Sequence, residues 1–85
     1  MLLFPYGNIM QIKDTKQLGG FIRTLRKRMR VSQKDLALTS GTGLRFIIDL
    51  EKGKTTCHTG KVLTVLNTLG VAITALPPAQ FGDDA

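Results

Sequence analysis

The stretch "SQKDLALTSGTGLRFIIDLEKGK" (residues 32–54) contains the start and end signals of two short helices. Ser32 is a favoured N-cap residue, and Asp35 stands at the third helical position, where a capping box places its acid. Gly41 suits the left-handed position that follows a helix, and Gly53 marks a second helix end in the same way. The stretch therefore predicts a two-turn helix, a tight turn and a second short helix.

The second of these helices is apolar on almost every side. Its large apolar side chains are Leu44, Phe46, Ile47, Ile48 and Leu50. A helix that is hydrophobic all round is normally buried in a core. It is therefore either a core helix or a helix whose apolar side chains contact something other than water.

Two more helices and one strand are predicted around this stretch. Asp14-Thr15 offers an N-cap for a helix over residues 15–30, and a fourth helix lies within residues 58–70. Their expected core positions are Leu18, Phe21, Ile22, Leu25 and Met29 in the first, and Val62, Leu63, Leu66 and Leu69 in the fourth. Gly19 and Gly20 weaken the first helix but allow another backbone to approach closely. A β-branched, alternating run predicts a short strand made of Val71, Ala72, Ile73, Thr74, Ala75 and Leu76, which Pro77-Pro78 ends.

Length and composition fit one small domain. A chain of 85 residues lies near the lower limit for a self-sufficient core, so a second copy or a partner could contribute to stability. We expect an N-terminal arm at 1–13, a folded domain at 14–76 and a flexible tail at 77–85. The apolar start, residues 1–10, is too short to span a bilayer and has no basic segment before it. We therefore expect a cytoplasmic, nucleoid-associated protein without a membrane partner.

Few side chains are suited to catalysis or to metal binding. The single Cys excludes an internal disulfide and a CxxC metal site, and it fits a reducing compartment. Cys57 and His58 are neighbours in an expected loop, and no third group is evident that would orient a base. We therefore predict that the protein is not an enzyme and needs neither a cofactor nor a metal ion.

The positive charge is concentrated in the middle of the chain. The formal net charge is +6, and all 12 Lys and Arg residues lie between Lys13 and Lys61. Only four acidic residues lie among them, and the tail holds the other two. A compact basic body favours a polyanionic partner, with nucleic acid ahead of an anionic membrane. A merely solvated basic surface is the alternative that composition alone leaves open.

Two short helices joined by a glycine-containing turn, inside a bundle with a basic face, are typical of a helix-turn-helix. Ala37, Gly41 and Ile47 have the spacing of the small, turn and core residues of this motif. Together with Gln33, the preceding basic helix and the following "EKGK", the run closely resembles the phage-repressor-like (Xre/Cro) helix-turn-helix family. The resemblance implies an all-α, four- to five-helix domain that binds double-stranded DNA.

This resemblance divides the apolar helix into two sides. Ile47 and Leu50 are expected to face the core, with Phe46 at the flank. The residues expected at the bases of a major groove are Gly43, Leu44, Arg45, Ile48 and Asp49. Apolar side chains can pack on thymine methyl groups, and arginine is the natural partner of guanine O6 and N7. Asp49 can either brace the arginine or accept from cytosine N4. The alternative is that Leu44 and Ile48 pack under a neighbouring element.

Other residues are expected to hold the DNA backbone or the fold. Gln33 opens a helix whose free N–H groups favour a phosphate, and the family resemblance implies the same role. Further phosphate contacts are expected from Lys34, Lys52, Lys54 and Thr55, although each lysine alone could simply be solvated. The resemblance also implies a partly buried structural ion pair between Arg26 and Glu51.

The sequence after the DNA-binding run narrows the resemblance. Residues 15–76, above all "GKVLTVLNTLGVAIT" (60–74), look like the HipB-type antitoxins, small repressors encoded beside a HipA-type kinase toxin. That resemblance implies a homodimer in which the 71–76 strands pair across a twofold axis. A lone strand in a helical chain also needs a mate, and "MQIKD" (10–14) is the competing one. Gly43 departs from the Ser, Thr or Lys that is common in the family before the recognition helix.

The expected function is therefore sequence-specific repression by a homodimer, with a HipA-type kinase toxin as the second partner. The resemblance implies autoregulation of a toxin–antitoxin operon. A stand-alone or phage-type repressor without a toxin is the main alternative. A module that binds only proteins is a third possibility, which the basic charge disfavours.

Overall fold

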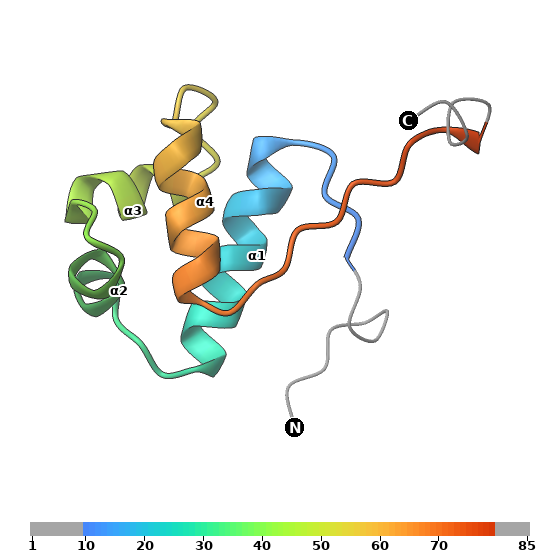
Figure 1. Cartoon of the computed structure of the whole chain (residues 1–85). Coiled ribbons are helices and arrows are strands. Elements are labelled where there is room, and N and C mark those ends of the chain that lie inside the picture. The colour runs from blue at the N-terminus through green and yellow to red at the C-terminus, as the bar shows by residue number, and fades with distance from the viewer. Residues whose placement is uncertain (1–9, 80–85) are drawn as a thin grey trace.

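The computed structural model describes residues 10–79, and four α-helices organise this part of the chain. They are α1 (Thr15–Arg28), α2 (Gln33–Ser40), α3 (Leu44–Glu51) and α4 (Thr59–Thr68). Helix α3 packs against both α1 and α2, and α2 packs against α4 (Figure 1). The predicted all-α architecture is confirmed with four helices.

The helix ends follow local capping signals in the sequence. The Gln17 N–H donates to Asp14 Oδ1 (2.7 Å), and the Asp35 N–H donates to Ser32 Oγ (3.0 Å). Gly41 has a φ of 70°, the left-handed conformation in which a glycine pays no steric penalty. The caps predicted at Asp14, Ser32 and Gly41 are therefore confirmed.

Helix α1 is shorter than predicted. It ends at Arg28 rather than at Arg30, because the chain turns back and the Val31 N–H donates to Arg26 O (3.1 Å). Arg30 has a φ of 60°, a conformation that L-residues seldom adopt. The helical spacing of apolar residues continues to Met29, so the sequence pattern does not reveal this turn. Met29 is 43% exposed and does not belong to the core.

The core lies where the four helices converge. Its largest fully buried side chains are Ile22, Leu36, Ile47 and Val65, one from each helix. Gly19 lets α1 and α3 cross closely, since a Cβ there would clash with Leu50 O and lie 2.7 Å from Glu51 O. The close backbone approach predicted at Gly19 is confirmed.

One side of the bundle is more open than the sequence suggested. Three expected core residues of α1, Leu18, Phe21 and Leu25, are only half-buried. On α4 the buried face is rotated, so that Val65 is fully buried and Leu63 is 44% exposed. Few contacts join α1 and α4 directly, because each packs chiefly on the helix-turn-helix unit.

The predicted strand at 71–76 is not formed within residues 10–79. These residues have no regular secondary structure, and Ile73 is 60% and Leu76 88% exposed. A strand needs a neighbour to accept and donate its backbone hydrogen bonds, and neither 10–14 nor any other described segment supplies one. Most of the expected arm and the end of the expected tail, residues 1–9 and 80–85, lie outside the described residues. No helix within residues 10–79 is long and apolar enough to cross a membrane.

Candidate nucleic-acid interface

A network of short hydrogen bonds fixes the turn between α2 and α3. The buried Ser40 hydroxyl donates to Leu36 O (2.6 Å) and lies 2.9 Å from the Thr42 hydroxyl. The Thr42 N–H donates to Ala37 O at 3.0 Å. Because these bonds tie the turn to α2, they hold α3 at a defined angle to it.

Helix α3 has an inner and an outer side, as predicted. Ile47 and Leu50 are 0% and 2% exposed and belong to the core. On the outer side Leu44 is 44% exposed, and Ile48 is half-buried at the boundary. The alternative has both Leu44 and Ile48 packed under a neighbouring element; Leu44 is open to water, whereas Ile48 is partly covered. The apolar composition of α3 serves the core on one side and an accessible surface on the other.

The N-terminus of α3 is open. Gly43 is the N-cap residue, and it provides no side chain to accept a hydrogen bond from the first turn. A Cβ built at Gly43 would meet nothing within 4 Å, so packing inside the chain does not demand a glycine there. A large ligand can therefore approach the backbone closely at this end.

Charged side chains form a connected group on the outer side of α3. The Arg45 Nη2 donates to Asp49 Oδ1 (2.9 Å), and Lys54 Nζ lies 3.6 Å from Asp49 Oδ2. The Arg45 side chain is 74% exposed, whereas that of Asp49 is 19% exposed. The hydrogen bond from Arg45 is the main cause of a lowered pKa at Asp49, and the positive charges of Arg45 and Lys54 lower that pKa further. Asp49 is thus an anion that orients an exposed guanidinium.

Most of the expected phosphate contacts lie at the surface. The exposed residues among them are Lys34, Lys52, Lys54 and Thr55. Gln33 is different, because its side chain is half-buried and its Nε2 donates to Glu51 Oε1 (3.1 Å). One N–H of the Gln33 amide is therefore used inside the protein, and the second N–H and the carbonyl oxygen remain for a ligand.

Arg26 and Glu51 form a two-pronged ion pair between α1 and α3. Arg26 Nε donates to Glu51 Oε2 (2.6 Å), and Arg26 Nη2 donates to Glu51 Oε1 (2.9 Å). A third guanidinium nitrogen, Nη1, donates to Val31 O at 2.8 Å. The two side chains are only 8% and 3% exposed, so the pair ties the two helices together away from water.

Several contacts of this surface were not predicted from the sequence. They are the hydrogen bonds from Gln33 to Glu51 and from the Thr15 hydroxyl to Gly53 O (2.8 Å), and the ion pair between Lys54 and Asp49. Lys61 Nζ also lies 5.8 Å from the centre of the Phe46 ring, in a cation–π contact. Each contact joins residues far apart in sequence or across a loop, where no helical periodicity signals them.

Comparison with known proteins decides the family. No protein-family model matches the chain. A relative from Sinorhizobium fredii (strain NBRC 101917 / NGR234) is described as "Uncharacterized HTH-type transcriptional regulator y4mF" and is 47% identical over 70 residues. The match covers 82% of this chain and 92% of the relative. The chain belongs to the HTH-type transcriptional regulators. This is a family of transcriptional regulators rather than of enzymes.

Solved structures show the same fold for this regulator. The structures described as "HipB-O4 20mer complex" and "Structure of HipA-HipB-O2-O3 complex" each match with a TM-score of 0.75 at 19% identity. Each match covers 81% of this regulator and 97% of the HipB chain. At this identity the similarity establishes a HipB-like arrangement of the helices.

Proposed function

We propose that this regulator is a sequence-specific repressor that binds double-stranded DNA as a homodimer, with α3 in the major groove. The Arg45–Asp49 pair is the observation that carries the proposal. It presents a guanidinium that is 74% exposed yet held in one orientation by an internal carboxylate. A bidentate contact to guanine needs such an oriented fork, and the five donors of arginine leave enough free for O6 and N7.

The remaining outer residues of α3 complement this arginine. Leu44 and Ile48 offer apolar surface for thymine methyl groups, which only A·T pairs present. Gly43 allows the backbone to come close to the DNA. In the proposed complex Asp49 keeps its hydrogen bond with Arg45 and orients it. Asp49 is then not the acceptor for a cytosine amino group.

Backbone contacts would come from the residues around this helix. Gln33 lies at the start of α2, where its remaining N–H can donate to a phosphate oxygen, and Lys34, Lys52, Lys54 and Thr55 flank the groove. Such contacts give affinity without base preference, and they make binding weaken steeply as salt concentration rises. Binding that hardly responds to salt would instead favour a role in protein interactions alone.

The decisive experiment is selection of bound DNA from random duplexes with the wild type and with Arg45→Ala. The wild type should enrich a palindrome, and Arg45→Ala should lose preference at one position in each half-site. Lys13→Ala is the matched control, because it removes one positive charge outside the helix-turn-helix unit. Loss of the same preference in the control would refute base recognition by Arg45.

The dimer is proposed to form through residues 71–76. Val71 is half-buried and its N–H donates to Leu66 O (2.9 Å), whereas residues 72–76 are exposed and form no strand pairing within residues 10–79, so that a second copy could provide the missing strand. A twofold dimer would place two α3 helices about 34 Å apart, one turn of DNA. Truncation after Gly70 should leave a helical monomer that binds DNA weakly. If the truncated chain still sediments as a dimer, the dimer interface lies outside residues 71–76.

We further propose that this regulator is an antitoxin that neutralises a HipA-type kinase and represses the operon encoding both. The support is the shared fold with HipB, which one solved structure contains together with HipA. Co-expression with a neighbouring kinase-like gene product tests this partner. Co-purification and loss of toxicity would support the antitoxin role, whereas a kinase equally toxic in its presence would leave a stand-alone repressor.

A further inference from the structure

The residue that follows α1 has a backbone conformation that a side chain disfavours. Within residues 10–79 each helix is followed by one residue with a positive φ: Arg30 (60°), Gly41 (70°), Gly53 (86°) and Gly70 (77°). Glycine adopts this left-handed conformation readily, whereas a residue with a Cβ is strained in it. Glycine thus occupies this position after three helices, and an arginine occupies it after α1.

The backbone of the turn holds Arg30 in this conformation. The Arg30 N–H donates to Lys27 O (3.0 Å), and the Val31 N–H donates to Arg26 O (3.1 Å). Val31 O accepts from Arg26 Nη1 (2.8 Å), and Arg26 is paired with the buried Glu51 of α3. None of these bonds uses the Arg30 side chain, so a glycine could form the same turn. The turn has a fixed position relative to α3.

The Arg30 side chain has no partner in the described part of the chain. The residue is exposed, and within residues 10–79 its guanidinium forms no ion pair or hydrogen bond. Residues 15–34 contain no acidic residue and seven basic ones, namely Lys16, Arg23, Arg26, Lys27, Arg28, Arg30 and Lys34. A free guanidinium in such positive surroundings attracts an external anion.

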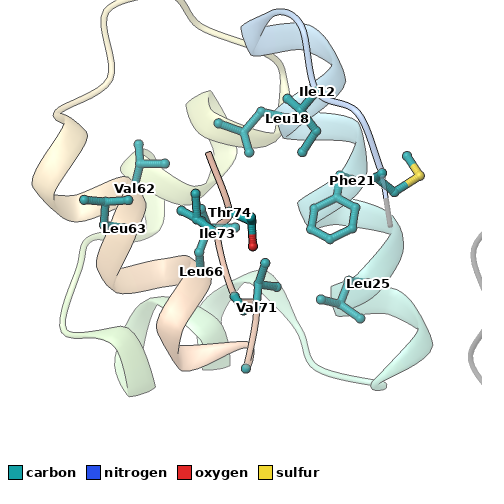
Figure 2. Close-up of a pocket in the computed structure, with 13 residues that line it drawn as sticks. Ile12, Leu18, Phe21, Leu25, Val62, Leu63, Leu66, Val71, Ile73 and Thr74 are labelled. Carbon is teal, nitrogen blue, oxygen red and sulfur yellow. The ribbon is translucent and has the colours of Figure 1, made fainter. Parts of the chain in front are cut away.

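The apolar face of α1 is kept apart from this charge. Figure 2 shows Phe21 and Leu25 of α1 beside an apolar groove between α1 and α4. The 13 residues that line this groove include no Lys, Arg, Asp or Glu. A polyanion would gain no charge contact in the groove, so it must approach α1 and the turn after it from another side.

Arg30 lies close to the phosphate contact proposed at Gln33. Only Val31 and Ser32 separate the two residues, so their Cα atoms lie within about 11 Å of each other. Gln33 keeps one amide N–H for a phosphate oxygen, because only the other is donated to Glu51. Phosphates follow one another closely along a DNA strand. An extended arginine side chain therefore reaches the phosphate next to the one held by Gln33.

We infer that the Arg30 guanidinium binds the DNA phosphate adjacent to the one proposed for Gln33. This inference rests on the proposed DNA binding by α3 and adds a contact to it. The planar guanidinium can donate two parallel hydrogen bonds to one phosphate. Because the turn is anchored to α3 through Arg26 and Glu51, the contact sets the position of α3 in the groove.

Two substitutions separate the charge of Arg30 from its conformation. Arg30→Gly removes both the charge and the strain, whereas Arg30→Lys keeps both. Arg30→Gly should raise the melting temperature by about 4 °C. It should also reduce the slope of log affinity against log salt concentration by about 0.9 per protomer, the value for one lost phosphate contact. Arg30→Lys should change neither quantity. A duplex of mixed sequence suffices as the probe, since a phosphate contact does not depend on the bases.

Arg23→Ala is the matched control for the loss of charge. It removes another exposed arginine of α1, about two turns before Arg30, and should leave the salt slope unchanged. If Arg23→Ala reduces the slope as much as Arg30→Gly, net charge causes the effect and the inference is overturned. An unchanged slope in Arg30→Gly also overturns it.

Uncharged methylphosphonates, placed one at a time in the duplex that the wild type selects, locate the contact. One replacement should weaken binding of the wild type but not of Arg30→Gly, and an adjacent one should have no effect on Gln33→Ala. If every replacement weakens the wild type and Arg30→Gly alike, Arg30 holds no phosphate and the inference alone fails. A wild type that binds no duplex would instead overturn the proposed function itself.

Discussion

Two of the ion pairs of helix α3 have similar bond lengths and opposite surroundings. Glu51, on the inner side, is 3% exposed and accepts two hydrogen bonds from Arg26, which is 8% exposed. Asp49, on the outer side, accepts one from Arg45, whose side chain is 74% exposed. The two pairs therefore differ in what surrounds the arginines and in the number of hydrogen bonds between the charges.

This contrast assigns the two pairs to different tasks. A buried pair has already lost its water, so removing one partner leaves an uncompensated charge. An exposed pair contributes little to stability, because water and salt screen it. We therefore expect the Arg26 pair to control folding and the Arg45 pair to control DNA recognition. Gln33 is the connection between the two regions, since it donates to Glu51 while it lies at the proposed phosphate site.

The largest expected effect is the loss of the buried pair. Arg26→Met should lower the free energy of unfolding by about 3–5 kcal/mol, because within residues 10–79 the buried Glu51 carboxyl group would keep Gln33 as its side-chain partner and lose the arginine. Urea denaturation measures this change. The double variant Arg26→Met/Glu51→Met is the control, and it should recover most of the loss because no buried charge is left. A double variant as unstable as the single one would show that shape, rather than charge, holds this site.

Removal of the exposed arginine should have the opposite profile. Arg45→Ala should leave the melting temperature nearly unchanged and weaken binding to a preferred DNA site by about 1–3 kcal/mol. Binding to scrambled DNA should fall much less, because the contact to a base is lost rather than a phosphate contact. Titrations of both duplexes at one salt concentration measure the ratio. If Arg45→Ala leaves the ratio of the two affinities unchanged, the exposed pair does not control DNA recognition.

The sequence predicts the helix-turn-helix well because its signals are local. A cap joins residues three apart, as Ser32 and Asp35 do, and a left-handed glycine such as Gly41 concerns a single residue. Helical spacing alone leaves apolar residues on almost every side of α3. The inner and outer sides of this helix are therefore assigned from the family resemblance, in which Ile47 has the spacing of the core residue.

The remaining differences depend on distant parts of the chain. The turn at Arg30 breaks an apolar pattern that, taken alone, continues to Met29. The rotation of α4 that buries Val65 and exposes Leu63 depends on packing against α2 and on the open groove. Whether residues 71–76 form a strand depends on a second segment, so β-branched composition alone cannot decide it.

Gln33 allows the coupling between the two regions to be measured. Gln33→Ala should weaken binding to all DNA sequences alike, by about 1 kcal/mol, because it removes a hydrogen bond to phosphate without altering a base contact. Gln33→Glu should weaken DNA binding further, because it places a carboxylate beside the DNA. It should also lower the melting temperature, because the same carboxylate lies beside Glu51. Affinities for preferred and scrambled duplexes, together with the melting temperature, distinguish these effects. If affinity falls only for the preferred duplex, Gln33 contacts a base rather than a phosphate.

The smallest expected effect is the titration of Asp49. Its pKa lies below the usual range, chiefly because Arg45 donates a hydrogen bond to it and then because Arg45 and Lys54 are positive, while burial opposes them. A carboxyl group with a lower pKa in the folded state stabilises the fold above its unfolded pKa. That contribution disappears as the pH falls through the lowered value. The hydrogen bond between Arg45 and Asp49 should therefore persist around neutral pH and be lost only in acid.

Carbon-detected NMR of the Asp49 carboxyl group can follow this titration directly. Arg45→Ala should raise the midpoint toward the ordinary value for aspartate, and Lys54→Ala should raise it less, because its amine lies farther away at 3.6 Å. Lys34→Ala is the control, since it removes an exposed charge from α2 and should leave the midpoint where it is. If Arg45→Ala leaves the midpoint unmoved, the carboxylate does not hold the arginine in solution. The exposed pair would then lose its role in orienting a DNA contact, while the buried pair would keep its role in folding.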